Sequence, residues 1–151
     1  MACNLQIAIV FEKLYSLTLH TYLPTIIGSK TGKFTSVYVS DCDTTKHECI
    51  LKRDSNVTII IDFTLAENVN AVKTVVHGKV MGVEMPFNLQ NPDACIGSGL
   101  ICPLSKTEIY VYTAVLPVLK AYPKVSVIVK WELKDEHDED IVCVEIPAKI
   151  Q

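Results

Sequence analysis

Apolar and polar residues alternate with a period of two from Thr31 to the end of the chain. In the clearest run, residues 125–134, apolar side chains at the odd positions alternate with mostly polar ones at the even positions. Alternation over this length predicts a β-strand with one buried face. Similar runs lie at 34–39, 57–64, 72–83, 108–114 and 141–150, with a weaker one at 49–52. No window after Thr31 has a helical period.

Turn-forming residues separate these runs, at 53–55, 68–70, 90–93 and 135–140. Six to eight short antiparallel strands within about 120 residues predict an all-β fold, a β-sandwich of two packed sheets. No repeat, linker or low-complexity segment divides the chain. A length of 151 residues, 49% of them hydrophobic, therefore indicates a single domain with one core.

The charge balance excludes a nucleic-acid-binding surface. Lys and Arg number 14 and Asp and Glu 17, and a nucleic-acid site needs clustered basic residues. The longest acidic run, 135–140, lacks the glycine and distal glutamate of a calcium-binding loop. We interpret this run as a solvated hairpin tip.

The first 27 residues read as a degenerate or misassigned leader. Residues 5–11 form a short apolar run, but no basic residue precedes it and Glu12 and Lys13 interrupt it. The run is too short to span a membrane. We therefore expect the folded domain to cover residues 28–151.

The cysteines indicate an oxidising compartment. There are six of them, at Cys3, Cys42, Cys49, Cys95, Cys102 and Cys143. Cys42 with Cys49, and Cys95 with Cys102, flank short polar loops, which is typical of disulfide bonds. Each bond would stabilise the fold by roughly 2–3 kcal/mol. The alternative is a zinc site that includes His47, but the ligand spacing fits no common zinc motif.

A glycosylation sequon supports the same compartment. Asn56-Val57-Thr58 is an acceptor triplet for N-linked glycans, so Asn56 is a candidate site. Together with the cysteine pairs it indicates a secreted chain.

No motif indicates catalysis, a cofactor or a metal. Gly97-Ser98-Gly99 is not a nucleophile elbow, which needs one more residue on each side of the serine and a strand-to-helix turn. The four histidines stand in no metalloprotease pattern. We therefore expect the protein not to be an enzyme.

A series of short motifs follows one another in a fixed order. They are His77-Gly78, Met81-Gly82-Val83, Pro86-Phe87, Pro92-Asp93, Cys95, Cys102-Pro103, Leu116-Pro117-Val118, Tyr122-Pro123, Trp131-Glu132-Leu133, Cys143 and Glu145-Ile146-Pro147. This series closely resembles the Niemann-Pick type C2-like soluble sterol carriers of the ML (lipid-recognition) domain family, as an arthropod member. The resemblance covers residues 28–150 in register.

The resemblance implies an immunoglobulin-like sandwich whose sheets splay around a hydrophobic tunnel. Phe87, Val118 and Tyr122 match the residues that line the sterol site of the family, and Tyr112 and Trp131 would line or buttress it. The implied function is non-covalent carriage of cholesterol or a related sterol, between membranes or to a membrane transporter. The protein would be a monomer, secreted or in the lysosomal lumen.

The resemblance also assigns a role to two loops. Val80, Met81, Gly82 and Val83 match the apolar mouth that meets a partner transporter or an anionic membrane surface. A Cys95–Cys102 bond would fix the loop that follows Phe87 and keep the mouth of the tunnel open.

The chain departs from the family pattern at two positions. Ile27 stands where the family has a cysteine that would pair with Cys143, so Cys143 is either unpaired or linked to Cys3. Val144 stands where vertebrate relatives often have tryptophan, and the smaller residue would widen the pocket or change its ligand.

Three alternative functions share the fold. Arthropod relatives resemble carriers of fatty acids or semiochemicals. An innate-immune binder of microbial lipids would favour a basic rim, whereas Glu84 lies beside the apolar loop. An adhesion domain would have a filled interior, and periodicity does not distinguish a filled core from a tunnel wall.

Overall fold

The computed structural model describes residues 25–26, 32–43, 45–87 and 89–151. Within these ranges the chain forms nine β-strands and no helix, and therefore no helix long and apolar enough to cross a membrane. The strands are β1 (Thr25–Ile26), β2 (Gly32–Val39), β3 (Cys49–Leu51), β4 (Ser55–Leu65), β5 (Lys73–Val80), β6 (Val83–Phe87), β7 (Ile109–Val118), β8 (Ser126–Lys134) and β9 (Asp140–Ile150).

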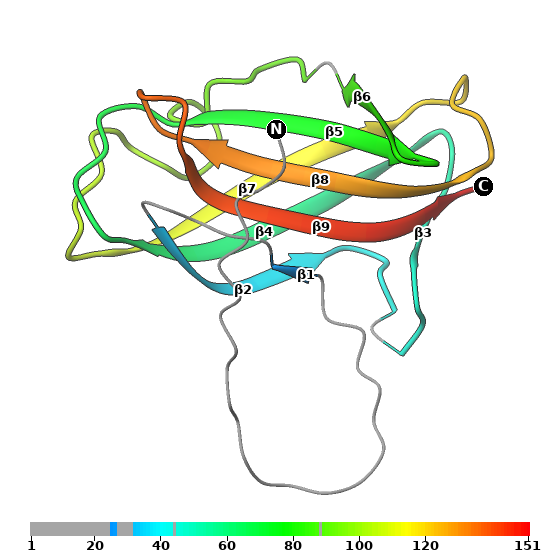
Figure 1. The fold of residues 1–151 in the computed structure, drawn as a ribbon, viewed down its shortest axis with the longest axis horizontal. Coiled ribbons are helices and arrows are strands. Elements are labelled where there is room, and N and C mark those ends of the chain that lie inside the picture. Colours follow the sequence, from blue (N-terminus) through cyan, green and yellow to red (C-terminus); the bar gives the residue numbers. More distant parts are fainter. Residues whose placement is uncertain (1–24, 27–31, 44, 88) are drawn as a thin grey trace, which may run out of the picture.

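The strands form two sheets that lie in two layers (Figure 1). The larger sheet has the order β1-β9-β8-β5-β6, with β3 also paired to β9, and the smaller sheet has the order β2-β4-β7. The predicted all-β sandwich is confirmed. The described strands outnumber the six to eight expected because β1, of two residues, is too short to give a periodic pattern and because the single run predicted at 72–83 contains two strands, β5 and β6. The β3–β9 pair is parallel, whereas antiparallel pairing was expected throughout.

The predicted strand at 72–83 is in fact a hairpin. β5 ends at Val80, Met81 and Gly82 form the turn, and β6 begins at Val83. Met81 and Gly82 have φ angles of 50° and 82°, which matches the left-handed pair that a tight two-residue hairpin turn requires. Apolar residues continue on both sides of the turn, but they change from even positions such as Val76 and Val80 to odd positions such as Val83 and Met85. This change of phase was the sign of the reversal that the prediction missed.

The core lies between the sheets. On β4 every second residue from Val57 to Leu65 is buried, as the pattern predicts. Trp131 on β8 pairs across the sheet with Val76 on β5 and Val144 on β9, so a row of buried side chains crosses three strands. Burial of each large apolar side chain stabilises the fold by about 1.5–3 kcal/mol.

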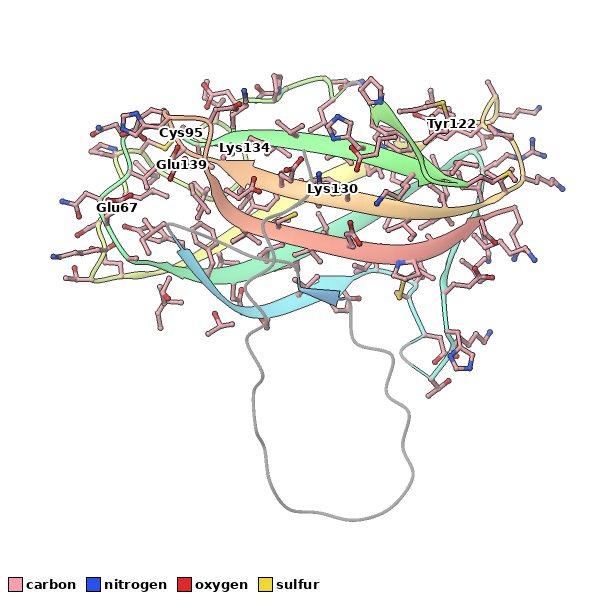
Figure 2. All side chains as sticks on the ribbon, viewed as in Figure 1. Glu67, Cys95, Tyr122, Lys130, Lys134 and Glu139 are labelled. Atoms are coloured by element: carbon pink, nitrogen blue, oxygen red, sulfur yellow. A yellow bond between two sulfur atoms is a disulfide. The ribbon has the colours of Figure 1, made fainter. Side chains whose placement is uncertain are left out.

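The outer face of β8 differs from the expectation of an exposed polar face. Lys130 is only 2% exposed and Glu132 only 4%. The Glu132 carboxylate lies 3.6 Å from the Lys130 ammonium and 3.4 Å from the Lys134 ammonium. Both lysines are on β8 (Figure 2). The period of the strand predicts which residues share a face. It does not predict that Lys130 and Glu132 are buried, which their ion pairs with one another make possible.

The acidic run is the predicted hairpin tip, between β8 and β9. Asp135 Oδ1 accepts hydrogen bonds from the backbone N–H groups of His137 and Glu139, at 2.8 and 3.0 Å. The carboxylate therefore stabilises the turn.

Two of the predicted disulfide bonds are present. Cys42 is bonded to Cys49 and Cys95 to Cys102, so the zinc alternative is wrong. Cys143 is also disulfide-bonded rather than unpaired. Cys3, Ile27 and the apolar run 5–11 lie outside the described residues, whereas Thr25 and Ile26, inside the predicted leader, pair with Glu145 and Val144.

Candidate functional site

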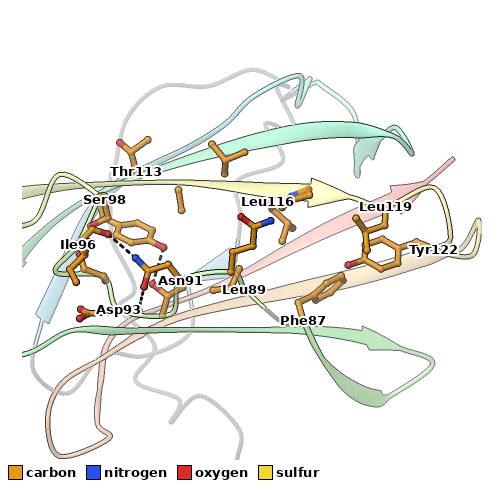
Figure 3. Close-up of a pocket in the computed structure, with 18 residues that line it drawn as sticks. Phe87, Leu89, Asn91, Asp93, Ile96, Ser98, Thr113, Leu116, Leu119 and Tyr122 are labelled. Carbon is orange, nitrogen blue, oxygen red and sulfur yellow. Dashed lines mark hydrogen bonds between the residues drawn. The ribbon is translucent and has the colours of Figure 1, made fainter.

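A groove of about 410 Å³ lies between β7 and the segment that follows β6 (Figure 3). β6 and β7 are edge strands of the two sheets, so no strand pairing closes the sandwich on this side. Phe87 and Tyr122 lie at one end of the groove, and Asn91, Asp93 and Ser98 lie at the other. The volume is in the range of sites that hold small apolar molecules.

Two aromatic rings form the apolar end of the groove. The rings of Phe87, the last residue of β6, and Tyr122, which follows β7, meet edge to face with centroids 5.5 Å apart. The Tyr122 N–H donates to the Leu119 carbonyl at 3.1 Å, and Arg53 Nη1 donates to the Lys120 carbonyl at 3.2 Å. These bonds hold the turn that carries Tyr122. Such ring pairs add about 0.5–1.5 kcal/mol beyond the area that they bury.

Gly78 on β5 leaves the space in which the Phe87 ring lies. Phe87 pairs directly with Val76, and its ring extends diagonally to Gly78. A Cβ atom at Gly78 would lie 2.6 Å from Phe87 Cε2 and 3.3 Å from Val127 Cγ2. The ring position at the groove therefore depends on the absence of a side chain at Gly78.

We expect the substitution Gly78→Ala to displace the Phe87 ring from Tyr122, because a flexible ring moves more easily than the backbone of β5. The overall fold should remain, since alanine is at least as favourable as glycine within a strand. Nuclear Overhauser effects between the two rings measure the displacement. In a Phe87→Ala background the same substitution should change nothing at Tyr122, and an unchanged ring contact in the single variant would contradict this role of Gly78.

The floor of the groove holds a buried pair of hydroxyl groups. Thr74 Oγ1 and Tyr112 Oη lie 2.9 Å apart, and both side chains are buried. Burial raises the pKa of the Tyr112 phenol above its ordinary value of 10.0, so the group stays protonated at neutral and acidic pH. The hydrogen bond between the two hydroxyl groups satisfies both of them. A buried hydroxyl group without a hydrogen-bond partner would lower the stability of the fold by about 1–3 kcal/mol.

Behind this floor Tyr112 contacts Trp131. The two rings meet edge to face with centroids 6.3 Å apart. The Trp131 side chain is buried, with 1% of its surface exposed. Tyr112 thus lies between the groove and the indole in the centre of the core.

A second, inner cavity lies between the sheets. Its volume of about 20 Å³ is enough for about one water molecule. It is lined by Val39, Leu51, Val57, Ile59, Leu116, Val129, Trp131, Ile146 and Ala148. The groove and the inner cavity are two distinct cavities, and the open tunnel between the sheets that the resemblance implies stays a prediction.

The disulfide-bonded loop closes the polar end of the groove. Cys95 lies at the opposite end of the long axis from Tyr122 (Figure 2). The Ala94 N–H donates to Val72 O at 2.9 Å, and the Thr113 N–H donates to Ser98 O at 2.8 Å. The loop therefore bridges the larger sheet at β5 and the smaller sheet at β7.

The structure brings together some of the residues predicted for the site. Phe87, Tyr112 and Tyr122 line the groove, and Trp131 lines the inner cavity. Val118 is buried and lines neither cavity.

Val144 and the predicted mouth loop lie outside both cavities. Val144 is fully buried, and its effect on the pocket stays a prediction. The loop from Val80 to Val83 is the tip of the β5–β6 hairpin, where Met81 is 98% exposed. β6 runs from this tip to Phe87, a separation of roughly 13 Å for a strand of this length.

Sequence reasoning missed several lining residues. They are Thr74, Leu89, Asn91, Ile96, Leu116 and Leu119. Leu116 shares the inward alternation of Tyr112 and Val118, which was a usable signal. Leu119 follows the end of β7, where no pattern applies.

Residues 28–150 match the family model described as the ML domain. The chain belongs to the ML domain family. This ML domain is 70% identical over 124 residues to the NPC intracellular cholesterol transporter 2 homolog a of Drosophila melanogaster, a match that covers 82% of this chain and 84% of that protein. It is 37% identical to the NPC intracellular cholesterol transporter 2 of Bos taurus, over 82% of this chain and 81% of that protein.

A solved structure agrees with these relatives. The crystal structure of a Niemann-Pick type C2 protein from the Japanese carpenter ant matches this ML domain with a TM-score of 0.82 and 35% identity. The match covers 86% of this chain and 100% of that chain. The resemblance to an arthropod Niemann-Pick type C2-like protein and the immunoglobulin-like sandwich are therefore confirmed. This ML domain is a sterol- or lipid-binding carrier and not an enzyme.

Proposed function

We propose that this protein binds cholesterol or a related sterol non-covalently in the groove and transfers it between membranes or to a membrane transporter. The observation that carries the proposal is the groove with the Phe87–Tyr122 ring pair at its apolar end. A sterol ring system is flat and apolar, and two aromatic rings offer it a matching wall. The relative from Drosophila melanogaster carries the name of a cholesterol transporter, which supports a sterol as the ligand.

The energetics suit a carrier. Burial of about 500 Å² of apolar ligand surface contributes on the order of 12 kcal/mol before the costs of association. Ordering and imperfect fit reduce this to a net value of about 8–10 kcal/mol, or a Kd between roughly micromolar and tens of nanomolar. Such a complex solubilises a sterol and still releases it. Binding needs no proton transfer, cofactor or metal.

The disulfide bonds support a location in an oxidising compartment, and the tip of the β5–β6 hairpin offers a surface for contact with a membrane or a transporter. Disulfide bonds persist in secreted proteins and oxidising compartments, so we place the protein outside cells or in the lysosomal lumen. Asn56 is exposed on β4 and accessible to glycosylation. The exposed apolar tip formed by Met81, Val83 and Met85 would meet an anionic membrane surface or a membrane sterol transporter.

Competition binding tests the proposal and separates it from the fatty-acid alternative. The fluorescent sterol dehydroergosterol serves as the probe, with cholesterol and oleate as competitors. Saturable binding that cholesterol displaces would support a sterol carrier. Displacement by oleate alone would assign the protein to the carriers of fatty acids or semiochemicals, and no saturable binding would remove the carrier function.

Removal of the disulfide bond at the groove should weaken binding selectively. In the double variant Cys95→Ser/Cys102→Ser we expect weaker sterol binding, because the loop no longer holds the polar end of the groove, and a free energy of unfolding lower by about 2–3 kcal/mol. The matched control is Cys42→Ser/Cys49→Ser, since both bonds close loops of the same sequence separation, 7 residues. Ile96, Gly97 and Ser98 of the Cys95–Cys102 loop line the groove, whereas no described residue of the Cys42–Cys49 loop does. Chemical denaturation and probe titration give the two quantities. Equal loss of affinity in both variants would contradict a specific role for the Cys95–Cys102 loop.

A further inference from the structure

The tip of the β5–β6 hairpin carries both methionines that the structure describes. Met81 is 98% exposed and Met85 is 52% exposed, and together with Val83, which is 63% exposed, they form the apolar surface of the tip. No heavy atom lies within 4 Å of the position that a Cβ atom at Gly82 would take. The tip therefore projects into solvent, and two of its three exposed apolar side chains are thioethers.

Turn chemistry does not account for a methionine at position 81. Met81 has a φ of 50°, in the left-handed region, and a tight hairpin turn with this backbone usually has Asn, Asp or Gly at that position. The long apolar side chain packs against almost nothing in the fold, because it is nearly fully exposed. What the side chain meets outside the fold therefore accounts for the methionine.

Met85 is open to the same small molecules as Met81. It pairs across the hairpin with Gly78, which has no side chain to cover it. β6 is also the edge strand of the larger sheet, so Met85 has a cross-strand neighbour on one side alone. Both thioether groups are therefore accessible to reagents dissolved in water.

The other readily oxidised side chains are protected in the part of the chain that the structure describes. The cysteines there, at positions 42, 49, 95, 102 and 143, are all disulfide-bonded, so none offers a thiol. Trp131 is buried in the core. A mild oxidant should therefore modify the hairpin tip before it reaches any of these residues.

We infer that Met81 and Met85 form an oxidation site, at which hydrogen peroxide releases the protein from a lipid surface. A lone pair of the thioether sulfur attacks a peroxide oxygen, so that an S–O bond forms while the O–O bond breaks. The proton of the transferred oxygen passes to the leaving hydroxide, which departs as water. The sulfur is oxidised to a sulfoxide and the peroxide is reduced.

The sulfoxide is polar, whereas the thioether is apolar. Oxidation of both methionines would leave Val83 as the one large apolar side chain of the tip, and binding to a lipid surface scales with the apolar area that it buries. The modification would therefore control contact with the membrane without a change in the fold. This inference rests on the proposed function, because it needs the hairpin tip to contact a membrane.

Vesicle association before and after peroxide treatment tests the inference. The vesicles contain phosphatidylcholine and phosphatidylserine, and peptide mass spectrometry follows the oxygen added to Met81 and Met85. We expect peroxide to weaken the association of the wild type by about tenfold, because the apolar contacts of both side chains are lost. Methionine sulfoxide reductases should restore it. The Kd for dehydroergosterol should not change, since neither methionine lines the groove.

The matched control is the double variant Met81→Leu/Met85→Leu. Leucine conserves the apolar volume of methionine and has no sulfur to oxidise. The association of the untreated variant is its own reference, and peroxide should leave that value unchanged. The variant retains Met1, so it also controls for oxidation of that residue.

Three results would overturn the inference. They are unchanged association after full oxidation of both methionines, an equal loss of association in the leucine variant, and methionines that peroxide does not modify in the folded protein. Failure of the proposed membrane contact gives a different result, namely no association of the untreated wild type with the vesicles, and it would remove the inference as well. Failure of the carrier function would appear as no saturable binding of dehydroergosterol.

Discussion

The substitution Trp131→Ala is expected to lower the free energy of unfolding by about 3–5 kcal/mol, the usual cost of removing a large buried aromatic side chain. Trp131 is 1% exposed, pairs across the sheet with Val76 and Val144, and contacts the ring of Tyr112. Its removal would enlarge the inner cavity, because the β-branched side chains around it are too stiff to fill the space. Urea denaturation followed by far-ultraviolet circular dichroism measures the change, since the variant has no tryptophan emission.

Two control variants show whether the loss of stability comes from the buried volume of Trp131. Trp131→Phe keeps most of the apolar volume and should cost clearly less. Tyr38→Ala, on the exposed face of β2 where Tyr38 is 58% exposed, should stay within about 0.5 kcal/mol of the wild type. A loss below about 1 kcal/mol for Trp131→Ala would mean that the residue does not sit at the centre of the core as described.

The substitution Phe87→Ala is expected to raise the Kd for a sterol by about 10- to 100-fold, as for the truncation of an aromatic anchor in a binding pocket. The ring forms one wall of the groove and contacts Tyr122, so its loss removes ligand contact and loosens the opposite wall. Phe87 is only partly buried, so the fold should tolerate the change. Equilibrium titration with dehydroergosterol measures the Kd.

The matched control for this variant is Met85→Ala. Met85 lies two residues away on β6, is 52% exposed and does not line the groove, so the sterol Kd should stay at the wild-type value. Equal affinities for wild type and Phe87→Ala would place the ligand elsewhere. Equal weakening in both variants would point to damage to the β5–β6 hairpin rather than to a binding wall.

The alternating pattern predicted the long strands because each has one face against the other sheet. The prediction missed β6, since apolar residues continue on both sides of the turn at Met81 and Gly82 and only their change of phase marks it. Alternation also states which residues share a face but not what lies against that face. The burial of Lys130 and Glu132 therefore could not be read from the sequence.

The family motifs indicated Phe87 and Tyr122 at the site, and the structure places both at one end of the groove. The division into a groove and an inner cavity could not be predicted, because Tyr112, Leu116 and Val118 occupy equivalent inward positions of one strand. Only the three-dimensional arrangement separates a groove wall, a residue that lines both cavities and a packed core residue. The role of Gly78 likewise depends on where the Phe87 ring lies in space.

The central claim is that the protein carries an apolar lipid held at the groove, and sterol transfer between vesicles tests it most directly. Donor vesicles contain dehydroergosterol and acceptor vesicles contain a quencher of its emission. The account predicts that the transfer rate rises in proportion to the concentration of wild-type protein and that Phe87→Ala gives a much smaller rise. A transfer rate that does not change when the wild-type protein is added would contradict it.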